Sequence, residues 1–97
     1  MNLNQISLPA ADLRASIAFF EMLGLKLIVE TDIYARFECP EGDATMSLHK
    51  IESRPADDGI YVYFECDDLD ARVESLIAAG LTFDSEPQDM RWLWREA

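Results

Sequence analysis

Two side chains in this sequence, His49 and Glu65, are of types that move protons in enzyme sites. His49 is the single histidine of the chain and could act as a general base near neutral pH. It could equally be a solvent-facing histidine at the end of a strand. Glu65 could be a general base or bind a cation, or it could simply pair with Arg36. Both are therefore candidate catalytic residues, each with a plain structural alternative.

Aromatic residues form a second candidate group, in two closely spaced pairs near the middle and the end of the chain. Tyr61 and Tyr63 could stack on a flat ligand or donate hydrogen bonds to it. Trp92 and Trp94 could line an apolar pocket. Tyrosines at a dimer surface, and tryptophans in an interface or core, would give the same pattern. The rings favour a small-molecule site without proving one.

The elements that must position these residues follow from hydrophobic spacing. In the first half, alternation predicts a strand over 3–8, closed by Pro9. A helix should follow, with Asp12 as its N-cap and Gly24 at its end. Strands are then expected over three segments, 25–31, 34–39 and 44–51.

The second half has the same order. A strand is expected over 60–66, and then a helix that Asp67 or Asp68 caps and Gly80 ends. Strand segments at 81–83 and 90–95 should follow. The polar stretch 52–59 between the halves has the composition of a linker.

The two halves align as an internal repeat, because Asp12-Leu13 and Asp68-Leu69 are 56 positions apart, and so are Gly24 and Gly80. We therefore expect one α+β domain over 1–97. Its first module covers about 1–52, its linker about 52–59 and its second module about 60–97. The repeat predicts a partner for strand 44–51 beyond position 97, so we expect the second module to be incomplete at the C-terminus.

Strand alternation also predicts which side chains share a surface. One face of the sheet should carry polar and aromatic groups, while the opposite, uniformly apolar face packs on the helices. The residues expected on the first face are Gln5, Tyr34, Arg36, Glu38, Ser47, His49, Tyr61, Tyr63, Glu65, Trp92 and Trp94.

Charge and composition exclude several classes of partner. The formal net charge is −11, which disfavours binding to nucleic acid or to an anionic membrane. No apolar run reaches the roughly 18 residues of a membrane span, and the N-terminus lacks the features of a signal peptide, so we expect a cytoplasmic protein. Cys39 and Cys66 lie in apolar strand patterns and are expected to be small buried hydrophobic residues.

Three segments resemble a known family. Residues 5–13 (QISLPAADL), 16–25 (SIAFFEMLGL) and 61–70 (YVYFECDDLD) are similar to the strand and helix starts of vicinal oxygen chelate proteins. That superfamily includes glyoxalases, bleomycin resistance proteins and extradiol dioxygenases. The resemblance covers nearly the whole chain. It implies two βαβββ modules that together form a cup-shaped mixed sheet.

The resemblance also implies where a metal ligand would lie. Family ligand positions fall on Gln5, Ser47 and Tyr61, and a further position lies beyond Ala97. Glutamine is permissible at the first position, whereas neutral serine and tyrosine are poor ligands for a divalent cation. His49 could act as a ligand displaced by two residues. We therefore expect no cofactor, with a divalent metal on Gln5 and His49 as the alternative.

Three functions remain open. The first is a glyoxalase/bleomycin-resistance-like protein that binds a small aromatic or cationic ligand in the cup, without the family's full metal site. The ligand would contact Arg36, Glu38 and the aromatic pairs. The second is a metal-dependent lyase, isomerase or dioxygenase that uses Glu65 and His49. The third is a structural or interaction unit. The resemblance implies a homodimer in each case.

Overall fold

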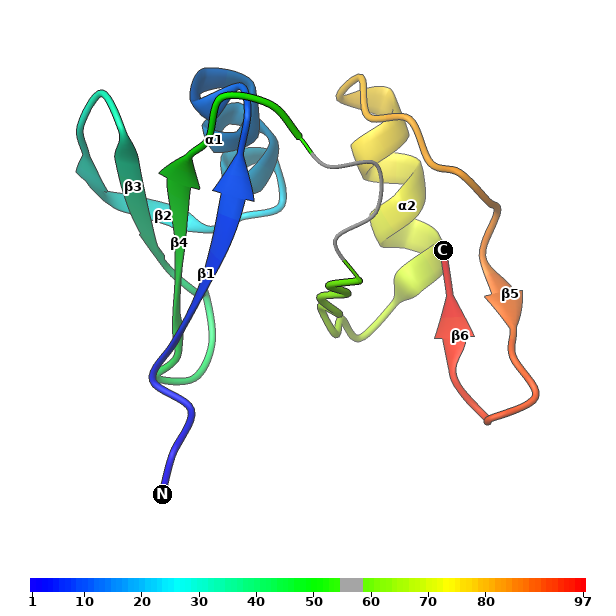
Figure 1. The fold of residues 1–97 in the computed structure, drawn as a ribbon. Coiled ribbons are helices and arrows are strands. Elements are labelled where there is room, and N and C mark those ends of the chain that lie inside the picture. Colours follow the sequence, from blue (N-terminus) through cyan, green and yellow to red (C-terminus); the bar gives the residue numbers. More distant parts are fainter. Residues whose placement is uncertain (55–58) are drawn as a thin grey trace. The chain divides into compact units, whose positions relative to one another are not determined.

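The computed structural model describes residues 1–54 and 59–97 (Figure 1). The chain divides into two compact units, Met1–Asp58 and Gly59–Ala97. The boundary falls within the expected linker, of which residues 55–58 lie outside the described part. Each unit has its own helix and its own strands, so each is described by itself.

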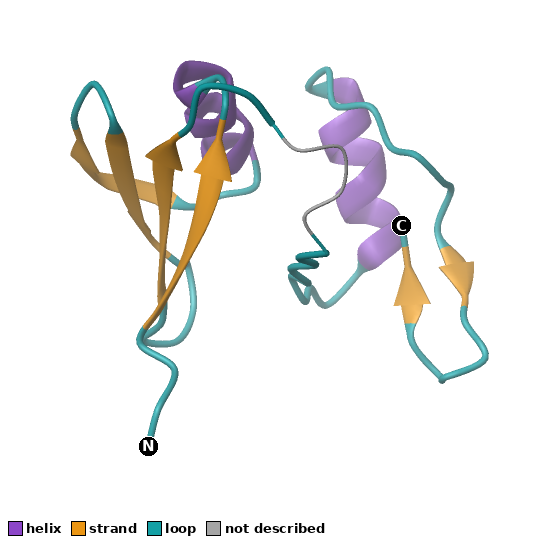
Figure 2. Ribbon diagram, viewed as in Figure 1, coloured by secondary structure: helices purple, strands orange, loops and turns teal. Residues whose placement is uncertain are grey.

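The first unit is a βαβββ module. Its elements are β1 (Gln5–Ala10), α1 (Leu13–Met22), β2 (Lys26–Glu30), β3 (Tyr34–Glu38) and β4 (Thr45–Lys50). The strands form one mixed sheet in the order β1-β4-β3-β2 (Figure 2). Strand β1 is parallel to β4, and the other pairs are antiparallel. The predicted α+β class and the first module are confirmed.

Strand β1 differs from its prediction at its end. It continues through Pro9 to Ala10, and the Ala10 carbonyl accepts a hydrogen bond from the Ile51 backbone N–H at 3.0 Å. Proline is tolerated there because β1 lies at the edge of the sheet, where β4 is its one partner among the described strands. A proline on an edge strand can place its missing N–H on the side that has no partner.

Helix α1 begins where the sequence predicts. The Asp12 side chain accepts a hydrogen bond from the Ala15 backbone N–H at 3.1 Å. After the helix, Gly24 has a φ of +97°, a backbone conformation that residues other than glycine rarely adopt. Leu13 and Ile17 are buried on the inner side of the helix. The spacing of its apolar residues thus places α1 against one face of the sheet.

The core of the first unit lies between α1 and the sheet. Phe37 and Ala35 of β3, with Met46 and Leu48 of β4, are almost completely buried. Alternation places these four side chains on the same face of neighbouring strands. The full buried cluster is Ala10, Leu13, Ile17, Leu25, Ala35, Phe37, Met46 and Leu48. All of its members belong to the first unit.

The second unit contains one helix and one small hairpin. Helix α2 (Leu69–Ala78) is capped by Asp68, whose side chain accepts from the Ala71 N–H at 3.0 Å. Strands β5 (Gln88–Asp89) and β6 (Arg95–Glu96) pair antiparallel. A hydrogen bond of 2.7 Å closes the loop between them, from the Met90 backbone N–H to the Trp94 carbonyl.

Three strand predictions in the second half are wrong for this structure. Segments 60–66 and 81–83 contain no assigned strand, and 90–95 is mostly the turn of the β5–β6 hairpin (Figure 2). The second βαβββ module and the cup of two modules are therefore not formed by the described residues. The reason is physical: a strand needs a neighbour to pair its backbone groups, whatever its side chains favour.

The two cysteines also depart from the prediction. Both are free thiols; Cys39 is partly buried, but Cys66 is exposed. Cys66 was expected on the inner face of a strand over 60–66, and that strand is absent. Among the described residues, no helix is long and apolar enough to cross a membrane.

Candidate functional site

One face of the sheet in the first unit carries polar side chains. It is the face opposite the core, and we call it the polar face. The pairing registers set Gln5 opposite Thr45, Arg36 opposite Ser47 and Tyr34 opposite His49. Its members are Gln5, Ser7, Tyr34, Arg36, Glu38, Thr45, Ser47 and His49. This is the surface that strand alternation predicts for the first half.

A hydrogen-bonded network connects three strands across this face. The Gln5 Nε2 donates to Ser47 Oγ at 3.0 Å. The Thr45 hydroxyl donates to Gln5 Oε1 at 3.0 Å, and Arg36 Nη2 donates to the same hydroxyl oxygen at 3.3 Å. Both ends of the Gln5 amide are thus engaged, and its orientation is fixed. The Gln5 amide and the Arg36 guanidinium share Thr45 as a partner.

Ser47 is the fully buried polar residue at the centre of this network, with 0% of its surface exposed. It lies on the polar face, on the side of the sheet opposite the core. Gln5 bonds to it from one side, and Arg36 is its register partner on the other. A hydroxyl buried in this way needs a hydrogen bond, and Gln5 supplies it.

His49 lies at one end of the polar face and is exposed. Its Nδ1 and the Ser7 Oγ are hydrogen-bonded at 3.0 Å, and Tyr34 is its register partner on β3. This contact occupies one ring nitrogen and leaves Nε2 directed elsewhere. His49 can therefore still donate or accept one hydrogen bond, according to its tautomer.

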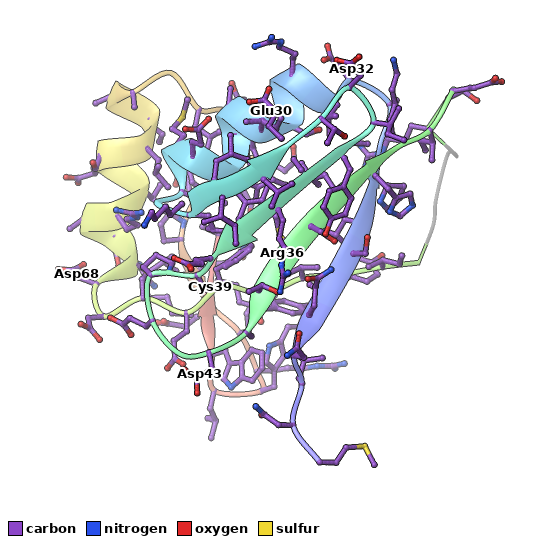
Figure 3. The ribbon with its side chains drawn as sticks, turned by 90° about the vertical axis from the view of Figure 1, so that its left-hand side faces the viewer. Glu30, Asp32, Arg36, Cys39, Asp43 and Asp68 are labelled. Atoms are coloured by element: carbon purple, nitrogen blue, oxygen red, sulfur yellow. The ribbon has the colours of Figure 1, made fainter. Side chains whose placement is uncertain are left out.

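Arg36 occupies the middle of the polar face, and Figure 3 shows its side chain between the two ends of the sheet. Glu30 and Asp32 lie toward one end, and Cys39 and Asp43 lie toward the other. Glu38 is two residues beyond Arg36, and its carboxylate lies 3.9 Å from Lys26 Nζ. The Arg36 Nε is buried and has no hydrogen-bond partner among the described residues.

The remaining predicted site residues belong to the second unit, where they are exposed. Tyr61 is 76% exposed, and Glu65 is also on the surface. The rings of Tyr63 and Trp94 meet edge to face, with centroids 5.9 Å apart. The Trp92 indole N–H donates to a carboxylate oxygen of Glu96 at 2.7 Å. Because 60–66 is not a strand, alternation no longer determines which of its side chains share a face.

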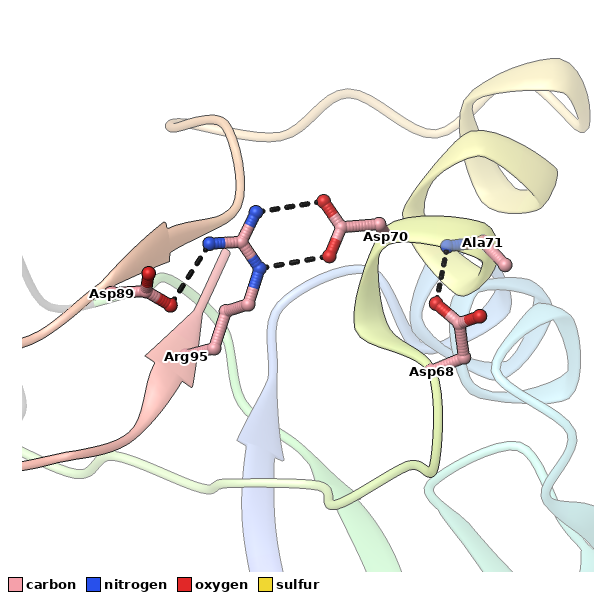
Figure 4. A network of polar contacts seen from close by, with 5 residues as sticks. All are labelled: Asp68, Asp70, Ala71, Asp89 and Arg95. Carbon is pink, nitrogen blue, oxygen red and sulfur yellow. Dashed lines mark hydrogen bonds and ion pairs between the residues drawn. The ribbon is translucent and has the colours of Figure 1, made fainter.

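The second unit also contains an ion-pair network that the sequence did not indicate. Arg95 of β6 donates two hydrogen bonds of 2.8 Å to Asp70 in the first turn of α2, and a third of 3.0 Å to Asp89 (Figure 4). The hydrogen bond from Arg95 holds the pKa of Asp70 below its ordinary value, with a smaller charge contribution. Asp70 and Asp89 in turn raise the pKa of Arg95. Asp70 lies 25 positions before Arg95, and Asp89 faces Arg95 through the pairing of β5 with β6, so no local pattern in the sequence connects the three.

The sequence matches the model of a known protein family. The model of the Glyoxalase/Bleomycin resistance protein/Dioxygenase superfamily matches residues 2–96. The chain belongs to this superfamily. The resemblance noted from the strand and helix starts is thereby confirmed. No curated protein matches the sequence significantly.

Solved structures of superfamily members share the fold. A glyoxalase/bleomycin resistance protein/dioxygenase from Nocardioides is 25% identical with a TM-score of 0.78, over 95% of this chain and 70% of that one. A bleomycin-binding protein complexed with bleomycin is 17% identical with a TM-score of 0.72, over 98% and 84%. Lactoylglutathione lyase from Agrobacterium tumefaciens is 20% identical with a TM-score of 0.68, over 93% and 78%.

The donor atoms at the superfamily's metal positions do not fit a divalent cation well in this member. Gln5 Oε1 already accepts a hydrogen bond from Thr45, and Ser47 is a neutral hydroxyl buried beneath its neighbours. The Arg36 guanidinium bonds to the same Thr45 oxygen, so it adds positive charge at this point. In residues 1–54 and 59–97, no group of three or more His, Cys, Asp or Glu side chains could hold a metal ion.

Proposed function

We propose that this superfamily member binds a small aromatic or cationic compound on the polar face of its first unit, and that binding does not require the superfamily's full metal site. One functional parallel is a bleomycin-binding protein of similar fold, whose structure contains bleomycin. At 17% identity that likeness concerns the fold. The binding function itself rests on the residues of this chain.

The main support for the proposal is the pair of hydrogen bonds made by the Thr45 hydroxyl. This hydroxyl donates to the oxygen of Gln5 and accepts from Arg36. A metal bound at Gln5 Oε1 would share that oxygen with the Thr45 hydrogen bond and would approach the positive charge of Arg36. A neutral aromatic ligand does not meet that repulsion, and the exposed His49 can contact it.

Within this proposal, Arg36 and Glu38 provide charged contacts, and His49 provides a hydrogen bond at the end of the face. Tyr61, Tyr63, Trp92 and Trp94 remain predicted ligand contacts on the second unit, as Glu65 remains a predicted catalytic or charged contact. Small-molecule sites generally combine a few fixed polar groups with apolar and aromatic surface. The partner proposed here is a small molecule, in a protein that we still expect to be a homodimer.

The metal-dependent enzyme is the alternative that an experiment must separate from this proposal. The protein would be screened by NMR against aromatic and cationic compounds, bleomycin among them. The screen would be run once in EDTA, which removes divalent ions, and once with added Zn²⁺, Ni²⁺ or Co²⁺. We expect binding in EDTA that Gln5→Ala weakens, because that change releases Ser47 and Thr45. Gln88→Ala, an exposed glutamine on β5, is the matched control and should have no effect.

Two outcomes would overturn the proposal. A stoichiometric divalent ion, lost together with ligand binding on Gln5→Ala or His49→Ala, would support the lyase, isomerase or dioxygenase alternative. Absence of any ligand binding, with or without metal, would leave the structural or interaction role.

A further inference from the structure

We propose that the ligand of the polar face is an aromatic compound carrying a carboxylate, and that Arg36 binds the carboxylate. This inference rests on the proposed binding function and narrows its ligand to one chemical class. The observation behind it is a guanidinium that the first unit leaves only partly satisfied.

The chain offers many carboxylates with which Arg36 could pair. The sequence has 19 acidic residues and 8 lysines and arginines, so carboxylates are abundant. Among the described residues, Lys26 has Glu38 within 4.0 Å, and Arg95 has both Asp70 and Asp89. No carboxylate described in the first unit lies within that distance of Arg36. An acidic protein thus leaves a central arginine without an anionic partner on its own sheet.

The hydrogen bonds of Arg36 are also incomplete. Its Nε is buried without an acceptor in the described part of the chain, and its Nη2 donates to the Thr45 hydroxyl at 3.3 Å. That length is at the long limit for an N–H···O hydrogen bond. A buried donor without a partner costs about 1–3 kcal/mol. A ligand that provides an acceptor for Nε would recover this cost.

A carboxylate is the group that fits a guanidinium best. Its two oxygens accept two parallel N–H groups, one of them Nε–H, and these charge-assisted bonds are short and strong. For the carboxylate to reach the buried Nε, the side chain has to turn outward, which gives up the long 3.3 Å bond to Thr45. Glu38, the nearest acidic residue along β3, is already occupied by Lys26.

The apolar neighbours of Arg36 suggest where the ring of the ligand would lie. Val29 of β2 is the register partner of Arg36 and is 40% exposed. Tyr34 lies two residues before Arg36 on the same side of β3 and is partly buried. A flat ring attached to the carboxylate could pack on these two side chains. This place is therefore cationic at Arg36 and apolar beside it, which matches a ligand with a carboxylate on a ring.

Isosteric probes separate charge from ring binding. Benzoate, benzamide and benzamidine have the same ring and nearly the same shape, with charges of −1, 0 and +1. Each would be titrated into the ¹⁵N-labelled full chain in EDTA at physiological ionic strength, and the shift changes of polar-face residues would give a Kd. We expect benzoate to bind about tenfold more tightly than benzamide, the factor that corresponds to roughly 1.4 kcal/mol, and benzamidine to bind most weakly.

Variants assign the preference to Arg36. Arg36→Met should abolish the preference for benzoate over benzamide, so that the two probes bind with about the same Kd. Arg36→Lys keeps the positive charge but loses the two parallel N–H donors of the guanidinium, so it should retain only part of the preference for benzoate. Arg14→Met is the matched control, because Arg14 is an exposed arginine of α1 and its removal changes the net charge equally. It should preserve the wild-type order of the three probes.

The outcomes distinguish the two proposals. Equal binding of the three probes, a preference for benzamidine, or a benzoate preference that survives Arg36→Met would each overturn the carboxylate site and leave the binding function standing. If neither these probes nor any screened compound binds, both proposals fail together.

Discussion

Helix α1 of the first unit and helix α2 of the second each span ten residues, and each begins at an aspartate whose side chain accepts from the N–H three residues later. Each is followed by a glycine with positive φ, +97° at Gly24 and +104° at Gly80. Their surroundings differ. Helix α1 packs on a four-stranded sheet with a continuous core, whereas α2 belongs to a unit whose only assigned strands, over 59–97, are two residues long.

This difference separates local from non-local information. A cap, an apolar stripe and a terminal glycine act within one stretch of chain, so they specify both helices equally well. A sheet needs backbone partners from distant segments. Tyr, Val and Phe over 60–66 favour a strand, but no described segment pairs with these residues as a neighbouring strand.

The largest effect should come from the core of the first unit. Phe37→Ala removes a completely buried ring from the centre of the core and should lower the free energy of unfolding by about 3–5 kcal/mol. Ile77→Ala in α2 removes a side chain that is 54% exposed, and the loss should be far smaller. Urea unfolding followed by NMR signals of each unit would measure both. Similar losses would show that Ile77 contributes to a core as much as Phe37 does, and would contradict the difference between the two units.

A smaller and more equal effect is expected at the caps. Asp12→Ala and Asp68→Ala each remove one side-chain acceptor at a helix N-terminus, which typically costs about 1 kcal/mol. Amide hydrogen exchange in the first turn of each helix would show the change. Asp12→Ser and Asp68→Ser keep an acceptor and should restore protection. A large effect in one helix only would break the equivalence of the two.

The smallest effect concerns the exposed Arg95 network. Hydrogen bonding from Arg95 lowers the pKa of Asp70 in the folded chain, so its contribution to stability is present above the ordinary value of 3.8 and is lost as the pH falls through the lowered pKa. Asp70→Asn should loosen the β5–β6 hairpin at neutral pH and remove this acid-dependent step. The Trp92 indole signal between pH 6 and pH 2 would report it. An unchanged titration in the variant would contradict this role.

Much of the first unit could be predicted from the sequence, because its signals are local or alternate along strands. The four strands, the Asp12 cap and the polar face containing Gln5, Arg36 and His49 all follow from such signals. Pro9 misled the prediction of the end of β1, since its effect depends on whether the strand lies at an edge. The second unit was predicted less well, because the expected strands there depend on partners.

The details of the site needed three-dimensional structure. The sequence places Gln5, Ser47 and Arg36 on one face, but it does not show that Thr45 joins Gln5 to Arg36. Ser7 was not predicted as a partner of His49, although its alternation with Gln5 on β1 could have indicated it. The unpartnered Nε of Arg36 has no sequence signature, because it depends on where every nearby acceptor lies.

The central claim is that the polar face of the first unit is the ligand site, and a ¹⁵N NMR titration with benzoate in EDTA tests it most directly. We predict saturable shift changes concentrated at Gln5, Ser47 and Arg36, and their loss in Arg36→Met but not in Arg14→Met. Shift changes confined to the second unit, around Tyr63 and Trp94, would contradict the claim.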